Sequence, residues 1–332
     1  MGGAGLALPV DVAENIRLNP ALRSFNRGFK FDFPSLGYEL DGVSISDLRD
    51  YAGNVNGGGL NDNNLVRYAR QLGGRDTRYG FDAGIGFLVD GFSLMTYGQA
   101  TVLGKPNQDL RNWSNAGSLN NPPVGSQLDA YGLGYHTVDL GYGKPTSMKN
   151  GSLALGGTLR IINAYYGHKI VRFDGAGVNV ANGAEVQGAD TNSKSGVGVD
   201  VGAIYTVKST PRTHYGLVVQ NLVEPSVRFD RQVADSAAVL GDNITPFKRA
   251  INVGVGHITE NGKWLLAADL IDLGNNAGRG SLALGAMYNV SRSFGVGAGY
   301  NSLTGLTLGF SLFGINVAFE NQRPRLEYEF KF

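Results

Sequence analysis

Arg325-Leu326-Glu327-Tyr328-Glu329-Phe330-Lys331-Phe332 is the stretch that decides the fold, and it stands at the end of the chain. Successive side chains of an extended strand point to opposite faces, so the four apolar residues share one face and the four charged residues share the other. This pattern suits a strand of a membrane barrel, where lipid lies outside and a polar lumen lies inside. A strand of a soluble sandwich can show the same pattern. The choice between the two therefore depends on whether the rest of the chain repeats it.

The aromatic end of the chain carries a second expectation. Bacterial outer-membrane barrels commonly end on an aromatic residue that their assembly machinery recognises. We expect Tyr328, Phe330 and Phe332 to form this assembly signal.

The period of two recurs along most of the chain. In residues 294–301, bulky apolar residues alternate with glycine or asparagine, and residues 79–87 and 197–206 alternate in a similar way. Glycine weakens a strand, so a row of glycines on the wet face of a soluble protein would bring no benefit. In a membrane barrel the bulky residues meet lipid, and glycines on the lumen face leave room for something inside. The sequence therefore predicts an all-β fold, a transmembrane antiparallel β-barrel.

The strand count and the connections agree with this fold. About fourteen strands are expected, an even number as in single-chain outer-membrane barrels, at residues 29–40, 79–89, 92–102, 130–141, 152–173, 196–207, 214–223, 250–259, 263–272, 281–290, 293–301, 305–312, 314–320 and 325–332. Connections after the first four odd-numbered strands are long, and those after even-numbered strands are short. Asp90-Gly91 is a two-residue hairpin signal. Short periplasmic turns and long extracellular loops are typical of this class.

Composition excludes several other classes. The chain has 332 residues, no Cys, a net charge of +1 and a mean hydropathy of −0.12. No stretch approaches the roughly 18 apolar residues of a membrane-spanning helix, so a helical membrane protein is excluded. The near-zero net charge gives no footprint for nucleic acid. No signal peptide is visible, and we expect that a leader was removed from the mature chain.

Two segments outside the strands carry their own predictions. Residues 1–28 begin with glycines, continue as a short helix and end in a turn at Asn19-Pro20-Ala21, so they are expected to precede a barrel of residues 29–332. The first long connection, residues 41–78, is expected to be a helical extracellular loop. One helical face of that loop would carry Leu65, Tyr68, Ala69 and Leu72. This face is interpreted either as a lid packed over the barrel mouth or as a hydrophobic landing surface. Residues 111–125, rich in Gly, Asn and Pro, are expected to be a surface loop.

Polar residues on the lumen side are the remaining candidates for a site. They are Asp82, Arg160, Asp200, Asp269 and Glu320. One hypothesis is that they pair with one another or with the N-terminal residues 1–28. The other hypothesis is that they bind a solute. The four histidines show no ligand spacing, and His136 and Asp139 lie three apart on a strand, on opposite faces. We therefore expect no catalytic residues, no metal site and no cofactor, and we do not expect an enzyme.

The N-terminus also resembles that of a known family. Met1-Gly2-Gly3-Ala4-Gly5-Leu6-Ala7, followed by Asp11 and then by Asn19-Pro20-Ala21-Leu22, resembles the N-terminal motif of FadL-type hydrocarbon transporters and their PorV-like and TraF-like outer-membrane relatives. Residues 216–222 and Pro225 also resemble a strand motif of these relatives. The resemblance implies that residues 1–28 enter the barrel from the periplasmic side as a hatch, with Asn19, Pro20, Ala21 and Leu22 at its turn. It also implies location in the bacterial outer membrane.

Two hypotheses about function follow from this resemblance. The first is passive, hatch-gated uptake of hydrophobic or amphiphilic small molecules, without ATP or metal. The second is a structural role, in which a plugged barrel anchors or hands over other proteins in secretion, conjugation or surface assembly. The expected partners are outer-membrane lipid, hydrophobic small molecules and the barrel assembly machinery, with surface or secreted proteins under the second hypothesis.

Overall fold

The structure is a computed structural model. It describes residues 4–9, 13–41, 70, 73–116, 123–173, 192–210, 212–232, 239–244, 246–278, 280–291, 293–313, 315–320 and 323–328. Within these residues, no helix is long and apolar enough to cross a membrane.

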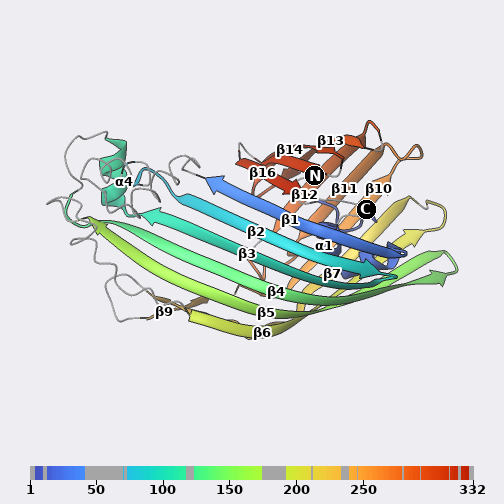
Figure 1. Cartoon of the computed structure of the whole chain (residues 1–332), viewed down its shortest axis with the longest axis horizontal. Coiled ribbons are helices and arrows are strands. Elements are labelled where there is room, and N and C mark those ends of the chain that lie inside the picture. The colour runs from blue at the N-terminus through green and yellow to red at the C-terminus, as the bar shows by residue number, and fades with distance from the viewer. Residues whose placement is uncertain are drawn as a thin grey trace.

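Two short helices precede the first strand: the α-helix α1 (Ala13–Leu18) and the 3₁₀ helix η1 (Pro20–Phe25). The main sheet then contains fourteen antiparallel strands in sequence order, which are β1 (Phe29–Asp41), β2 (Thr77–Val89), β3 (Phe92–Pro106), β4 (Ser126–Met148), β5 (Gly151–Phe173), β6 (Asn192–Val207), β7 (Thr213–Val223), β10 (Ala250–Ile258), β11 (Trp264–Ile271), β12 (Ser281–Asn289), β13 (Phe294–Asn301), β14 (Gly305–Leu312), β15 (Ile315–Glu320) and β16 (Arg323–Tyr328). The two end strands of this order, β1 and β16, lie against each other, so the sheet curls round into a barrel (Figure 1). The predicted all-β barrel of about fourteen strands is confirmed.

The two faces of the strands differ as predicted. On β5, Leu155, Leu159 and Ile161 are exposed on the outer face, whereas the alternate residues Ile162 and Ala164 are fully buried. The same alternation brings exposed leucines to the outer face of β12 and β14. The buried core therefore lies inside the barrel, and the outer wall is apolar.

Two connections contain structure that was not predicted. The expected surface loop at 111–125 overlaps the helix α4 (Gln108–Asn115), whose cap residue Asn107 accepts the Leu110 N–H at 3.0 Å through Oδ1. Leu110 and Trp113, three residues apart on one helical face, are buried. The long connection 224–249 contains a separate two-stranded sheet, β8 (Phe229–Gln232) and β9 (Val239–Ile244). The prediction of a loop was therefore wrong for the residues of α4. The Asn107 cap and the buried side chains of Leu110 and Trp113 stabilise the helix despite the helix-breaking residues around it.

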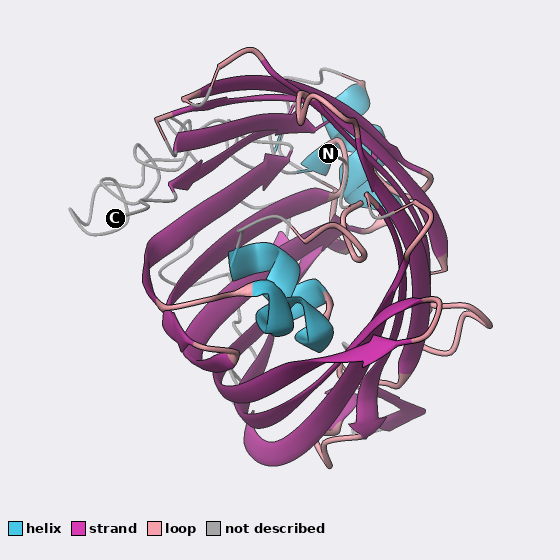
Figure 2. Cartoon of the chain, turned by 90° about the vertical axis from the view of Figure 1, so that its right-hand side faces the viewer, coloured by secondary structure: helices cyan, strands magenta, loops and turns pink. Residues whose placement is uncertain are grey.

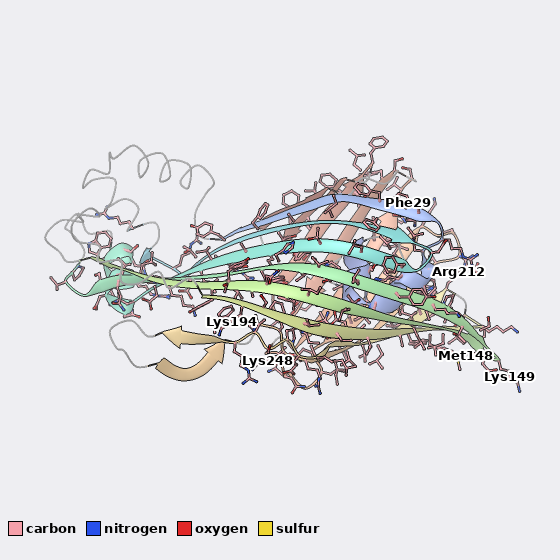
Figure 3. The ribbon with its side chains drawn as sticks, turned by 60° about the horizontal axis from the view of Figure 1, so that its bottom comes forward. Phe29, Met148, Lys149, Lys194, Arg212 and Lys248 are labelled. Atoms are coloured by element: carbon pink, nitrogen blue, oxygen red, sulfur yellow. The ribbon has the colours of Figure 1, made fainter. Side chains whose placement is uncertain are left out.

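The hairpin of β4 and β5 is longer than predicted. Each strand has 23 residues, and their register continues to Met148 opposite Gly151. The expected turn at 142–151 is therefore only Lys149-Asn150. At about 3.3 Å per residue, each strand is roughly 76 Å long, which exceeds the roughly 30 Å of a bilayer core. Figure 3 shows Met148 and Lys149 at the tip of this hairpin, at the same end of the molecule as Phe29 and Arg212.

Several predicted residues lie outside the described part of the chain. They are the loop residues Leu65, Tyr68, Ala69 and Leu72 and the terminal residues Phe330 and Phe332. Tyr328 is the last residue of β16.

Candidate functional site

The N-terminal segment, defined here as residues 4–9 and 13–28, packs on the inner face of the barrel. η1 contacts β4, β5 and β6. Viewed along the barrel, α1 and η1 lie within the curve of the strands (Figure 2). Leu8 and Ala21 in this segment are fully buried.

Inward-facing glycines make this close approach possible. A Cβ on Gly202 of β6 would lie 2.1 Å from Asn19 Oδ1, and one on Gly156 of β5 would lie 2.3 Å from the Pro20 carbonyl oxygen. A Cβ on Gly216 of β7 would lie 2.6 Å from Leu6 Cδ2. Any larger residue at these positions would occupy the space of the N-terminal segment.

Asn19 joins the two halves of the segment to the wall. As the cap of η1, it accepts the Ala21 N–H at 3.0 Å through Oδ1, and Pro20 occupies the first helical turn, where its missing N–H costs nothing. Its Nδ2 donates to the Leu6 carbonyl at 3.0 Å and to the Ala203 carbonyl of β6 at 3.4 Å. Because Asn19 is 0% exposed, no water replaces these bonds. Leu22, the last residue of the predicted motif, is buried beside Ala21 in the apolar cluster under η1.

Asp269 holds the first residues of the segment. From the inner face of β11, its Oδ2 accepts the N–H groups of Gly5 at 2.7 Å and Leu6 at 3.0 Å. Asp269 is buried, and charge-assisted bonds to backbone N–H groups are among the stronger hydrogen bonds. This contact is of the kind expected if lumen residues pair with the N-terminal segment.

Arg160 lies at the centre of a buried triad of charges. Its Nε donates to both carboxylate oxygens of Asp139 at 3.1 Å, and its Nη2 lies 3.0 Å from Asp139 Oδ2 and 3.0 Å from Asp200 Oδ2. Asp139 on β4 is directly opposite Arg160 on β5, while Asp200 comes from β6. The structure therefore brings together the predicted Arg160 and Asp200. It adds Asp139, which was considered from the sequence only as a partner for His136. Asp139 and the inward-facing Gly141 are two residues apart on β4 and therefore share a face, so this spacing could have placed Asp139 in the lumen.

Arg23 brings a fourth charge to the triad. It is 1% exposed, and it donates through Nε to Ser93 Oγ of β3 and through Nη1 to the Ile16 carbonyl at 3.4 Å. Burial lowers the pKa of Arg23 to about 10, and nearby Asp139 opposes this shift, so the guanidinium remains charged at neutral pH. A Cβ on Gly141 would lie 2.2 Å from Arg23 Nε, so this glycine leaves the space that Arg23 occupies.

With Arg23, the cluster contains two arginines and two aspartates, and its charges balance. The sequence analysis missed Arg23, which lies four residues after Asn19. A charged residue directly after the motif Asn19-Pro20-Ala21-Leu22 was the feature of the sequence that could have indicated it.

The other predicted lumen residues are placed apart from this cluster. Asp82 is half-buried in β2, in register with Gln99 of β3. Glu320 is the last residue of β15, in register with Thr307 of β14. Among the described residues, no group of three or more His, Asp or Glu side chains could hold a metal ion.

Beyond the triad, the inner wall becomes apolar and aromatic. Ile162, Ala164 and Tyr166 of β5 pack with Val227 and Phe229 from the connection after β7. The Tyr135 ring of β4 meets the Phe247 ring edge-on at a centroid distance of 5.2 Å. Apolar side chains therefore line this level of the lumen.

These contacts define a class of protein: an antiparallel β-barrel that carries its own N-terminal segment against the inner wall. Residues 17–312 match the family model described as "F plasmid transfer operon, TraF, protein". The chain belongs to this family, which confirms the expected likeness to TraF-like proteins. No curated protein matches the chain.

Solved structures with a similar course of the chain include two hydrocarbon channels and an enzyme. The Pseudomonas putida toluene transporter TodX is 12% identical, with a TM-score of 0.49 over 100% of this chain and 94% of TodX. The CymD monoaromatic hydrocarbon channel is 10% identical, with a TM-score of 0.36 over 98% of this chain and 93% of CymD. Outer membrane phospholipase A from Escherichia coli is 10% identical, with a TM-score of 0.30 over 90% of this chain and 88% of the enzyme.

Proposed function

We propose that this chain is an outer-membrane β-barrel for the passive uptake of hydrophobic or amphiphilic small molecules, with the N-terminal segment as its hatch. The observation that carries the proposal is the packing of this segment on the inner glycines of β5, β6 and β7, where hydrogen bonds and apolar contacts hold it without a covalent link beyond the chain itself. Non-covalent contacts of this kind can break and form again when the segment moves as a whole. The segment can therefore leave the lumen reversibly.

The outer wall supports a place in a membrane. Exposed aromatic residues gather near the short-turn ends of the strands, as expected for a girdle at a membrane interface, and they are Phe29, Phe92, Tyr142, Trp264, Phe294 and Phe313. Exposed leucines of β11, β12 and β14 continue the wall from there. A large apolar outer surface of this kind suits lipid and would be unstable in water. The short turns and the N-terminal segment would then face the periplasm.

The lumen supports the class of substrate. A hydrophobic molecule gains little from a polar pore, but it can move along an apolar wall. Leu133, Tyr135 and Phe247 supply partly exposed apolar surface beyond the charged cluster. The cluster and the N-terminal segment lie between this surface and the short-turn end, so hatch movement would control passage.

The experiment is a dye-uptake assay in a Gram-negative host. N-phenylnaphthylamine fluoresces when it reaches the inner lipid leaflets, and an intact outer membrane excludes it. Cells that make the chain should take up the dye faster than cells with an empty vector, and the hatch variant Asn19→Ala should be faster still. The matched variant Arg27→Gln changes an exposed residue of the same segment and should behave as the parent chain. Equal uptake with and without the chain would contradict the proposal.

A second candidate function is a structural role in assembly with other proteins. The β4–β5 hairpin favours it, because residues 144–150 are exposed and extend beyond the aromatic Tyr142 toward the proposed periplasm. The description of the family as an F plasmid transfer protein also points to this role. Removing residues 146–148 together with their partners 151–153, and keeping Lys149-Asn150 as the turn, shortens the hairpin without a change of register. This variant should then lose the assembly function and leave dye uptake unchanged.

A further inference from the structure

The connection after β7 folds inward and packs on the inner wall of the barrel. We define the strap as residues 224–229 and 246–249. Pro225 and Val227 pack on the inner face of β6, where a Cβ on Gly196 would lie 3.0 Å from Pro225 Cβ and 3.1 Å from Val227 Cγ2. Phe229 stacks on Tyr166 of β5 at a centroid distance of 5.6 Å. The strap therefore covers the inner wall at the apolar level of the lumen.

The strap begins at an irregular point of the wall. Val199 pairs with Val223 and Val201 with Val219, so one residue of β6 is opposite three residues of β7. At the centre of this bulge, Asn221 has a φ of 50°, which is uncommon for a residue with a side chain. Its Nδ2 donates to the Lys248 carbonyl at 3.0 Å, which ties the second half of the strap to the bulge.

The charged triad holds this bulge in place. The N–H of Asn221 donates to Asp200 Oδ1 at 2.7 Å, whereas Asp200 Oδ2 binds Arg160. The Asp200 carboxylate therefore joins the bulge, from which the strap begins, to the cluster that contains Arg23 of the N-terminal segment. Contacts run without a break from Asp139 through Arg160 and Asp200 to Asn221.

We propose that the Asp139–Arg160–Asp200 triad couples the N-terminal segment to the strap, so that withdrawal of Arg23 releases the strap. With Arg23 in place, two positive and two negative charges balance in a buried site. Without Arg23, the cluster keeps one uncompensated negative charge, which is costly in a low-dielectric site and draws water to the carboxylates. Hydrated Asp200 no longer holds the Asn221 N–H, and the bulge and the strap loosen. Coupling is reciprocal, so a ligand that lifts the strap also weakens the seat of Arg23.

This coupling deepens the proposed function, since it concerns how the hatch is regulated, but its test does not depend on uptake. The chain has no cysteine, so one introduced thiol reports on one site. Val227→Cys places a thiol at a position that is 1% exposed, and its rate of reaction with a charged maleimide measures how often the strap lifts. Ser126→Cys, at the buried start of β4 and away from both the N-terminal segment and the strap, reports general loosening of the barrel in the same way.

The decisive comparison adds Arg23→Gln to each thiol variant of the full chain in detergent micelles. We expect the Val227→Cys thiol to react at least about fivefold faster, the lower end of typical coupling between sites, and the Ser126→Cys thiol to react at an unchanged rate. Arg27→Gln should change neither rate. In the reverse direction, Asp200→Asn should accelerate a Leu22→Cys thiol in η1.

Two outcomes would overturn the coupling. In the first, Arg23→Gln accelerates the Leu22→Cys thiol and leaves Val227→Cys unchanged, so the segment moves without the strap. In the second, Ser126→Cys accelerates as much as Val227→Cys, so the barrel as a whole has loosened. The dye assay is independent of both readouts. A failure of uptake with intact coupling would count against the proposed function alone, and a failure of coupling with intact uptake would count against this inference alone.

Discussion

At the scale of single residues, Asn19 is the most consequential side chain of the N-terminal segment. Asn19→Ala removes the acceptor of the Ala21 N–H and the donor to the Leu6 and Ala203 carbonyls. A buried polar group left without a partner costs about 1–3 kcal/mol. We therefore expect faster dye uptake and a lower midpoint of thermal unfolding.

Asn26→Ala is the matched control for this prediction. Asn26 is also buried in the segment, but its side chain donates a single bond of 3.4 Å, to the Gly28 carbonyl. Its loss should have a much smaller effect on both measurements. Equal effects of Asn19→Ala and Asn26→Ala would mean that Asn19 has no special role.

A second prediction concerns Asp269, which the sequence placed in the lumen. Asp269→Asn keeps the shape of the side chain but removes the charge that strengthens the bonds from the Gly5 and Leu6 N–H groups. The Leu8→Cys thiol, buried in the parent chain, should then react with maleimide several-fold faster. Asp76→Asn, an exposed residue before β2 that pairs with Arg111, is the control and should leave that rate unchanged.

Sequence reasoning found some of these residues and missed others for a physical reason. Arg160, Asp200 and Asp269 could be placed in the lumen because the period of two gives the face of each strand. The period does not give the partner across the sheet, which depends on register. Asp139 was therefore missed, although register sets it directly opposite Arg160.

At the scale of elements, the inner glycines of β5 and β6 determine how closely the N-terminal segment can approach. Gly202→Ala and Gly156→Ala would each place a Cβ within 2.3 Å of Asn19 Oδ1 or the Pro20 carbonyl. Backbone and buried amide atoms cannot yield by that much without moving the whole segment. Each variant should therefore displace the segment and increase dye uptake.

Gly157→Ala is the control at this scale. Gly157 is next to Gly156 on β5, but its Cβ would meet only the Asp200 carbonyl oxygen at an ordinary 3.7 Å. It should fold and take up dye as the parent chain does. If Gly156→Ala behaved in the same way as Gly157→Ala, the close approach of η1 to β5 would be wrong.

The elements themselves were largely predictable. All fourteen barrel strands were expected at their places, because alternation and turn residues are local signals. The β4–β5 extension was not, since Gly143 and Pro145 favour a turn and only the pairing of the two strands keeps them extended. The inward course of the strap was also beyond local signals. It depends on a bulge and on contacts between Pro225 and Gly196 that join different strands.

At the scale of the whole molecule, the barrel is asymmetric. The strands β4 and β5 have 23 residues each, whereas β13 and β14 have 8 (Figure 1). The same long strands carry Asp139 and Arg160 and contact η1. The long side of the wall therefore holds η1, while the short strand β11 holds Gly5 and Leu6 through Asp269.

The place of this wall in lipid can be tested with the two tryptophans of the chain. Trp264 is 44% exposed on the outer face of β11, where its ring lies 4.8 Å from that of Tyr288, whereas Trp113 is 5% exposed in α4. In proteoliposomes, the variant Trp113→Phe keeps only Trp264. We expect its emission to be blue-shifted and to be quenched by brominated phospholipid, because tryptophan at a barrel girdle contacts acyl chains and headgroups.

The reverse variant supplies the control. Trp264→Phe keeps only Trp113, whose ring lies under the Arg70 guanidinium at 5.4 Å in α4. α4 contacts β4 at the end of the barrel opposite the short turns. Brominated lipid should leave the Trp113 emission nearly unchanged. Red-shifted, unquenched emission from Trp264 would mean that water surrounds the aromatic girdle, and the proposed membrane position of the barrel would then be wrong even with the fold intact.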